Sequence, residues 1–142
     1  MKKKIYIASD HAGFGLKEKI LEAKKDLFED LGTDSEESVD YPNFALNLIE
    51  KMKNDKESKG ILICGTGNGM AITANRSKHI RAGLVFNAEI TRLIRQHNNA
   101  NILVFPGRFI DVHEALKCVD IFLSTEFEEG RHKKRIDMIN EY

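Results

Sequence analysis

The chain has 142 residues, a length typical of one domain with a single core, and its 22 Lys and Arg residues balance 22 Asp and Glu residues. The formal net charge of zero excludes a global basic field that would attract nucleic acid, so any anion must bind locally. The basic N-terminus precedes only a short apolar run and no run of 18 apolar residues occurs, so we expect a soluble, cytoplasmic protein without signal peptide or membrane span. The two cysteines are not a close pair, so neither a zinc knuckle nor a disulfide framework is expected.

The first part of the chain begins with a predicted strand over residues 4–9, followed by a polar, glycine-containing turn over 10–15. An amphipathic helix comes next, and its apolar residues recur at helical spacing: Leu16, Ile20 and Ala23. Residues 26–32 could continue this helix, with Leu27 on the same face, or form a short second strand. We favour the strand because a loop rich in Ser, Asp and Glu follows.

The middle of the chain repeats the alternation of helix and strand. Residues 43–53 are predicted to be a helix, and its inner face carries Phe44, Leu48, Ile49 and Met52. The strand 60–64 is apolar throughout, as expected for a parallel strand covered on both faces. A glycine-rich loop leads from it into a short helix over 69–77, and a further strand is predicted over 81–86.

The last part of the chain has the same order of elements. A helix over 87–98 precedes the fifth strand, 100–105, which Pro106 and Gly107 close. The next helix covers 111–125, with Asp111 as its expected N-cap. Its inward residues are expected to be Val112, Leu116, Val119 and Leu123. A basic turn after residue 128 enters a final helix.

Five strands separated by helices predict an α/β fold, a Rossmann-like, doubly wound, mostly parallel sheet in three layers that forms one domain over residues 1–142. In such sheets, ligands bind beyond the carboxyl ends of the strands. Four polar turns are therefore expected along one rim, and they follow Ser9, Ile63, Phe86 and Phe105.

The loop "CGTGNG" (64–69) is the most distinctive of these turns. It lacks the Lys and Ser/Thr ending of a P-loop, and its glycines at Gly65, Gly67 and Gly69 do not have dinucleotide-binding spacing. Both departures argue against a nucleotide-binding loop. The backbone N–H groups of such a loop still form a nest for negative charge, which can be a phosphate or a developing enediolate.

Cys64 lies where the buried strand meets this loop. Next to the positive end of the following helix a thiol pKa can fall from about 8.5 toward neutrality, and the thiolate could act as a general base. The alternative is a small buried strand residue, since cysteine is often buried. Cys118 lies in the middle of a helix, away from any glycine loop, and is expected to belong to the core.

Three further segments carry polar side chains, and each of these could have either a functional or a purely structural role. Asp10 and His11 could bind a sugar or a phosphate, or Asp10 could only cap the next helix. His97 and Asn98 could bind a ligand or only end a helix. The last pair, Arg131 and Arg135, lies four residues apart on one helix face and could grip one phosphate or only be solvated.

Taken together, six segments resemble type B ribose-5-phosphate isomerase, in the same order and over nearly the whole chain: "SDHAGFGLK", "DYPNFA", "ILICGTGNGMAITANR", "IRAGLV", "RQHNNAN" and "EGRHKKR". The resemblance implies a metal-free isomerisation, with no cofactor, of ribose 5-phosphate and ribulose 5-phosphate through a cis-enediol. It also implies a homodimer, or a tetramer of dimers, with each active site between two subunits and the His97–Asn98 segment reaching in from the partner. Neither nucleic acid nor a membrane is implied as a partner.

The same resemblance implies a role for each candidate residue. Cys64 corresponds to the base, and Thr66 is available as a proton relay. Gly65, Gly67, Asn68 and Gly69 complete the anion hole with it. His97 corresponds to the residue that opens the furanose ring, and Asn98 to a ligand of a sugar hydroxyl. Substrate ligands correspond to Asp10 and His11, and the phosphate grip to Arg108, Arg131 and Arg135.

One departure assigns the subtype within the family. Some members lack the cysteine and use a glutamate just after the glycine loop, but this chain has Met70 there, which cannot take a proton. Two alternatives remain at this point. The chain could be a non-catalytic module that binds a nucleotide or a sugar phosphate, or it could perform the same chemistry on a six-carbon sugar phosphate.

Overall fold

The protein is described by a computed structural model that covers residues 4–142, and the lysines at positions 2 and 3 of the basic N-terminus lie outside the described residues. The strands are β1 (Ile5–Ser9), β2 (Glu29–Asp30), β3 (Lys59–Cys64), β4 (Ala82–Leu84) and β5 (Ile102–Pro106). The helices are α1 (Phe14–Ala23), α2 (Tyr41–Met52), α3 (Asn68–Ala74), α4 (Ala88–Asn98), α5 (Val112–Ser124) and α6 (Arg131–Asn140).

The strands form one sheet in the order β2-β1-β3-β5-β4, and all four pairings are parallel. The doubly wound α/β prediction is confirmed. Ile63 of β3 is level with Ser9 of β1 and with Phe105 of β5, so these three strands end at nearly the same height. The loops that leave them therefore meet at one edge of the sheet.

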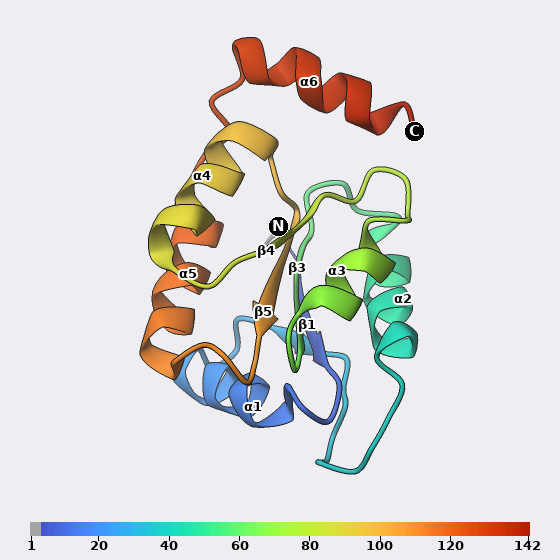
Figure 1. Cartoon of the computed structure of the whole chain (residues 1–142), viewed down its shortest axis with the longest axis vertical. Coiled ribbons are helices and arrows are strands. Elements are labelled where there is room, and N and C mark those ends of the chain that lie inside the picture. Colours follow the sequence, from blue (N-terminus) through green and yellow to red (C-terminus); the bar gives the residue numbers. More distant parts are fainter. Residues whose placement is uncertain (1–3) are drawn as a thin grey trace.

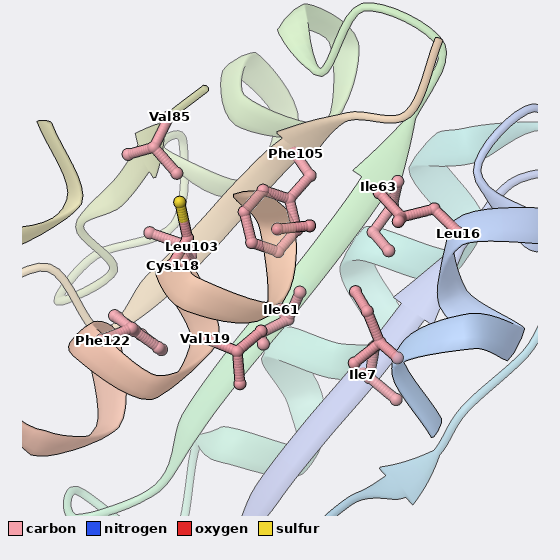
Figure 2. Close-up of a cluster of buried hydrophobic side chains, with 12 residues drawn as sticks. Ile7, Leu16, Ile61, Ile63, Val85, Leu103, Phe105, Cys118, Val119 and Phe122 are labelled. Atoms are coloured by element: carbon pink, nitrogen blue, oxygen red, sulfur yellow. The ribbon is translucent and has the colours of Figure 1, made fainter. Parts of the chain in front are cut away.

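Helices cover both faces of the sheet and give the three expected layers (Figure 1). Along β3, Ile61 and Ile63 belong to a core shared with α1, α4 and α5, whereas Leu62 and Cys64 belong to a second core shared with α2 and α3. Figure 2 shows the first core, in which Cys118 packs among aliphatic and aromatic side chains as predicted. A strand buried on both faces explains why this segment is apolar throughout.

The first helix and the second strand resolve the boundary that the sequence leaves open. Helix α1 ends at Ala23, so Leu27 is outside it and is exposed. The strand reading is confirmed, although β2 has only two residues and pairs with Tyr6 and Ile7 of β1. Such a short edge strand leaves little apolar periodicity to detect in the sequence.

The N-termini of α2 and α5 each differ in one respect from expectation. Helix α2 begins at Tyr41, two residues before the predicted start at 43, with Pro42 in its first turn, where a missing N–H costs nothing. Asp111 does occupy the N-cap position of α5, but its side chain makes no capping hydrogen bond. The expected role of Asp111 as a cap therefore holds for position only.

Helix α5 is buried along a wider face than predicted. Its fully buried residues are Ala115, Cys118, Val119 and Phe122. The expected inward residues Val112, Leu116 and Leu123 are only partly buried, although they pack against the same core. The reason is that α5 contacts α1 on one side and α4 on the other, so its apolar stripe turns toward the sheet between them.

The last helix stands apart from the rest of the fold. Figure 1 shows α6 beyond the end of α4, at the opposite end of the molecule from the loop that joins β3 to α3. Only Ile136 of α6 is buried, whereas Met138 and Ile139 are exposed. Within residues 4–142, none of the helices has the length and apolar character needed to cross a membrane.

Candidate functional site

The loops at the carboxyl ends of β1, β3 and β5 bring together most of the predicted site residues. We call this set the carboxyl-end group: Asp10, His11, Cys64, Gly65, Thr66, Gly67, Asn68, Gly69 and Arg108. Three backbone hydrogen bonds join the loops, from Asp10 to Ile63 at 3.1 Å, from Gly107 to Cys64 at 2.8 Å and from Arg108 to Gly65 at 3.1 Å. The loops therefore form one connected surface rather than three independent turns.

Cys64 is the last residue of β3 and lies level with Pro106 of β5. It is 5% exposed and shares its core with Met70, which is fully buried. Cys64 therefore packs as a buried strand residue and also lies at the start of the glycine loop, so its position is compatible with both roles considered from the sequence. The buried thioether of Met70 offers no proton acceptor beside it.

The glycine loop owes its shape to contacts that a side chain would disrupt. Gly67 has φ 81°, in the left-handed region, and a Cβ there would lie 2.4 Å from Leu84 Cδ1. A Cβ at Gly69 would lie 2.4 Å from Cζ of Tyr41. Among residues 4–142, no hydrogen bond uses the backbone N–H groups of Gly65, Thr66 or Gly67. These donors remain available to an anion at the loop.

Thr66 also has a structural task within this loop. Its Oγ1 accepts a hydrogen bond from the backbone N–H of Asn68 at 3.3 Å. The hydroxyl proton is therefore directed away from Asn68 and can be donated to another acceptor.

The expectation that Asp10 caps the next helix is not borne out, because Gly13 is the N-cap of α1 and no side chain caps this helix. Oδ1 of Asp10 accepts a hydrogen bond from the backbone N–H of Gly13 at 3.0 Å, and the residue is 5% exposed. The neighbouring His11 accepts a hydrogen bond at Nδ1 from the N–H of Val39 at 3.2 Å. When this imidazole is neutral, its proton must therefore lie on Nε2, which makes Nε2 a donor for a ligand oxygen.

Arg108 brings a cation to the glycine loop. Its side chain is exposed, and its Nη1 would lie 3.4 Å from a Cβ placed on Gly65. The guanidinium thus overhangs the first glycine of the loop, where it can bind a phosphate in a bidentate manner.

The remaining predicted residues form a second set, the amino-end group: His97, Asn98, Arg131 and Arg135. His97 and Asn98 end α4, and Asn98 is exposed. The ring of His97 stacks on that of His132 in α6, with centroids 4.4 Å apart and planes 16° from parallel. This stack joins the end of α4 to the helix that carries Arg131 and Arg135.

His132 is a residue of this region that sequence reasoning did not single out. Burial, then the nearby His97 and Arg131, lower the pKa of His132, so its neutral form is favoured. A second overlooked residue is Tyr41, whose ring packs against Gly69 at the carboxyl ends of the strands. The quoted segment "DYPNFA" contains it, and an aromatic residue before a proline at a helix start was the available signal.

The two groups are not brought together within one chain. Asn98 precedes the start of β5 at Ile102, whereas Cys64 is level with the end of β5 at Pro106. Four steps along a strand separate these levels by about 13 Å. Figure 1 accordingly shows α6 and the β3–α3 loop at opposite ends of the molecule.

The concave regions of the surface follow the same division. A pocket of about 590 Å³ is lined by residues that include Lys53, Lys78 and Arg81, and one of about 440 Å³ includes Asn98. No member of the carboxyl-end group lines either pocket.

One group of described side chains could in principle hold a metal ion, namely His97, Glu128 and His132, whose ligand atoms lie within 4.8 Å of one another. The two imidazole rings are stacked nearly parallel, so their in-plane lone pairs do not converge on one point. Nearby Arg131 adds positive charge. This arrangement suits a stacked pair better than a cation site.

Comparisons with known proteins identify the family. The family profile described as Ribose/Galactose Isomerase matches residues 5–139. The chain is 39% identical to ribose-5-phosphate isomerase B of Mycolicibacterium paratuberculosis, over 98% of this chain and 91% of that protein.

Solved structures give the same result. A ribose 5-phosphate isomerase B from Thermotoga maritima is 52% identical, with a TM-score of 0.94 and 100% coverage of both chains. The enzyme from Mycoplasma genitalium with bound ribulose-5-phosphate is 44% identical, with a TM-score of 0.92 and coverage of 100% of this chain and 97% of that one. From these matches over its whole length, the chain belongs to the ribose/galactose isomerase family.

Proposed function

We propose that this protein interconverts ribose 5-phosphate and ribulose 5-phosphate, an aldose-ketose isomerisation through a cis-enediolate. The observation that carries the proposal is the full-length similarity to ribose-5-phosphate isomerase B proteins, one of which holds ribulose-5-phosphate. The carboxyl-end group supplies chemistry that fits this reaction. A proton next to a carbonyl is weakly acidic, so its removal needs both a base and donors that stabilise the oxyanion.

In this proposal Cys64 is the base and carries a proton between C2 and C1. The unused N–H groups of Gly65, Thr66 and Gly67, together with Asn68 and Gly69 of the same loop, face the developing enediolate. One such donor is commonly worth about 3 kcal/mol of transition-state stabilisation. The Thr66 hydroxyl relays a proton to a sugar oxygen.

The remaining members of the group hold the substrate in this proposal. Asp10 and His11 bind sugar or phosphate oxygens, and Nε2 of His11 is the donor that its contact with Val39 leaves available. Arg108 binds the phosphate beside the loop. Because the phosphate does not react, these contacts supply binding energy that orients the sugar for proton transfer.

We propose further that each active site combines the carboxyl-end group of one chain with the amino-end group of a second copy. His97 then opens the furanose ring, Asn98 binds a hydroxyl, and Arg131 and Arg135 complete the phosphate grip. The separation of the two groups within one chain supports this arrangement. A homodimer is the smallest assembly that provides it, and pairing of dimers into tetramers is compatible with it. The reaction is proposed to need no metal or cofactor and to take place in the cytoplasm.

The test is an assay of the purified protein with ribose 5-phosphate, followed by ketose formation. Cys64→Ala should abolish turnover while substrate binding, measured by calorimetry, remains. An active Cys64→Ala variant would mean that the base is another residue. An inactive wild-type protein with all pentose and hexose phosphates would remove the proposal altogether.

A second candidate is the same reaction on a six-carbon sugar phosphate. The family description includes galactose isomerases, which favours testing it. One additional CHOH group requires only a slightly larger pocket, and such a difference is worth only about 1–3 kcal/mol in specificity. Competition between ribose 5-phosphate, allose 6-phosphate and galactose 6-phosphate for the purified enzyme decides between the substrates.

A further inference from the structure

Two arginines converge on the turn that follows His97 and Asn98. Arg81 donates from Nε to the backbone carbonyl of Asn99 at 2.8 Å. Arg95 donates from Nη1 to Oδ1 of the same Asn99 at 2.9 Å and to the carbonyl of Ala100 at 2.8 Å. The main chain and the side chain of one residue are thus held by two guanidinium groups.

Neither guanidinium forms an ion pair with a carboxylate among residues 4–142. Arg95 is only 6% exposed. Burial lowers the pKa of both Arg81 and Arg95, and for Arg81 the charge of Arg95 adds to the effect. The charge of Glu126 favours the cation of Arg95, but it does not reverse the effect of burial. Placing two such cations together is unfavourable unless carbonyl oxygens also compensate, so stability alone is a weak reason for this arrangement.

We call the contacts of Arg81 and Arg95 with Asn99 and Ala100 the clamp. The backbone of Asn99 is unusual. Asn99 has φ 50° and ψ 45°, a left-handed conformation in which asparagine is among the more tolerant residues. This conformation ends α4 and sets the direction in which the preceding residues His97 and Asn98 are presented. A small rotation at Asn99 would displace both of them.

The same arginines also hold both ends of the segment that carries the phosphate-binding residues. Arg95 donates from Nε to the carbonyl of Thr125, directly before the chain leads to α6, at 3.0 Å. Arg81 donates from Nη1 to Oδ1 of Asn140, the last residue of α6, at 3.2 Å. Since α6 has only one buried residue and stands apart in Figure 1, these polar contacts act together with the His97–His132 stack to hold it in place.

We propose that Arg81 and Arg95 are positioning residues that hold the His97–Asn98 turn and helix α6 as one unit. This unit presents the ring-opening histidine and the phosphate-binding arginines to the second copy in a fixed relation. The inference rests on the proposed function. It adds a role for two residues that do not touch the substrate.

The first experiment separates the clamp from the contact with α6 by steady-state kinetics. Asn140→Ala removes only the contact with α6, so KM for ribose 5-phosphate should rise about tenfold while kcat stays within twofold, because the phosphate contacts loosen. Arg81→Met removes the contacts with both Asn99 and Asn140, and a third with the carbonyl of His79 at 3.3 Å, so kcat should fall as well, by about 10- to 100-fold. Arg81→Lys should not restore activity, since an ammonium group cannot reproduce the fork of donors. The matched control is Arg92→Met, an exposed arginine on α4, which should behave as wild type.

The second experiment uses the chemistry of the two sugars. Ribulose 5-phosphate has its O5 esterified and cannot close a furanose ring, whereas ribose 5-phosphate can close one through O4. Solvent deuterium enters C1 of ribulose 5-phosphate by enediolate formation alone, without ring opening. Asn99→Gly keeps the left-handed backbone accessible but removes the contact with Arg95. It should lower kcat for ribose 5-phosphate about tenfold and leave deuterium exchange at saturating ribulose 5-phosphate within twofold.

These results have distinct meanings. If Asn99→Gly lowers kcat for ribose 5-phosphate and the rate of deuterium exchange into ribulose 5-phosphate equally, the positioning role is overturned, because the whole site is then damaged. Wild-type kinetics in Arg81→Met and Asn140→Ala would overturn it as well. The failure of the proposed function looks different, because the wild-type enzyme itself would then show neither turnover nor exchange. Asn140 and Asn99 are not core residues, so their variants keep the measurement possible if Arg81→Met does not fold.

Discussion

Lys17 and Asp30 form an ion pair in which the ammonium group is fully buried, and Nζ of Lys17 donates to both carboxylate oxygens at 2.9 Å. Asp30 also accepts a hydrogen bond from the N–H of Gly32 at 2.9 Å. The pair connects α1 to the two-residue strand β2 at the edge of the sheet. It therefore fixes the start of the loop that leads to Tyr41.

The asymmetry of this pair leads to the first prediction. Asp30 is 40% exposed in its side chain, so without Lys17 it can be solvated, whereas Lys17 without Asp30 is a buried charge left with only the longer contact to Glu18 at 3.9 Å. We expect Lys17→Met to lower the free energy of unfolding by about 1–2 kcal/mol and Asp30→Asn by about 3 kcal/mol or more. Urea denaturation measures both. The reverse order would contradict this account, and Lys133→Met, in an exposed pair, serves as a control that should have no measurable effect.

The glycine loop gives a second prediction. Gly67→Ala places a Cβ 2.4 Å from Leu84 Cδ1 at a residue with φ 81°, so we expect a loss of about 1–3 kcal/mol of stability and of most activity. Gly15→Ala is the matched control, because nothing lies within 4 Å of its Cβ position in α1. That variant should be as stable as wild type or up to about 1 kcal/mol more stable. Equal behaviour of the two alanine variants in thermal unfolding would show that the loop tolerates a side chain.

The third prediction concerns the two thiols. Burial raises the pKa of the Cys118 thiol, and a hydrogen bond with Thr91 only partly offsets this. A raised pKa means less thiolate at any given pH, so Cys118 should resist alkylation at pH 8. Iodoacetamide should therefore modify Cys64 about tenfold faster or more, and ribulose 5-phosphate should slow that modification. Mass spectrometry of the peptides measures both rates, and faster labelling of Cys118 would refute the prediction.

The fourth prediction tests whether the active sites are shared between chains. Cys64→Ala and His97→Ala proteins should each be inactive, but after unfolding and refolding together, mixed dimers contain one site with both residues intact. Random pairing returns about a quarter of the wild-type activity. Refolding each variant alone is the control. If mixing restores nothing while wild type refolds to full activity, the two residues act within one chain.

Much of the fold could be predicted because the apolar runs of the strands are distinct. Residues 60–64 illustrate this, since burial on both faces leaves no polar position in the run. The edge was harder to predict: β2 has only two residues, and its place in the sheet depends on pairing with β1 rather than on its own composition. The buried face of α5 was predicted incompletely because the spacing of apolar residues within one helix does not show which elements pack beside it, here α1 and α4.

The candidate site divides in the same way. Cys64, the glycine loop and Asp10 could be proposed from the sequence because each directly follows a strand and strand ends converge. The clamp of Arg81 and Arg95 on Asn99 could not be foreseen. Most contacts of the two arginines are with backbone carbonyls, including those of Asn99, Ala100 and Thr125, which carry no sequence signal, and the contact from Arg81 to the side chain of Asn140 joins residues 59 positions apart.

The parallel sheet has one more consequence. The members of the two groups stand at opposite ends of β5, from Ile102 to Pro106, so the strand acts as a spacer of about 13 Å between them. A deletion of two residues within β3 and β5 would preserve the alternation of side chains and every proposed site residue. In the proposed dimer it would nevertheless present the two groups to neighbouring copies at the wrong separation, so the proposed shared site requires a particular strand length.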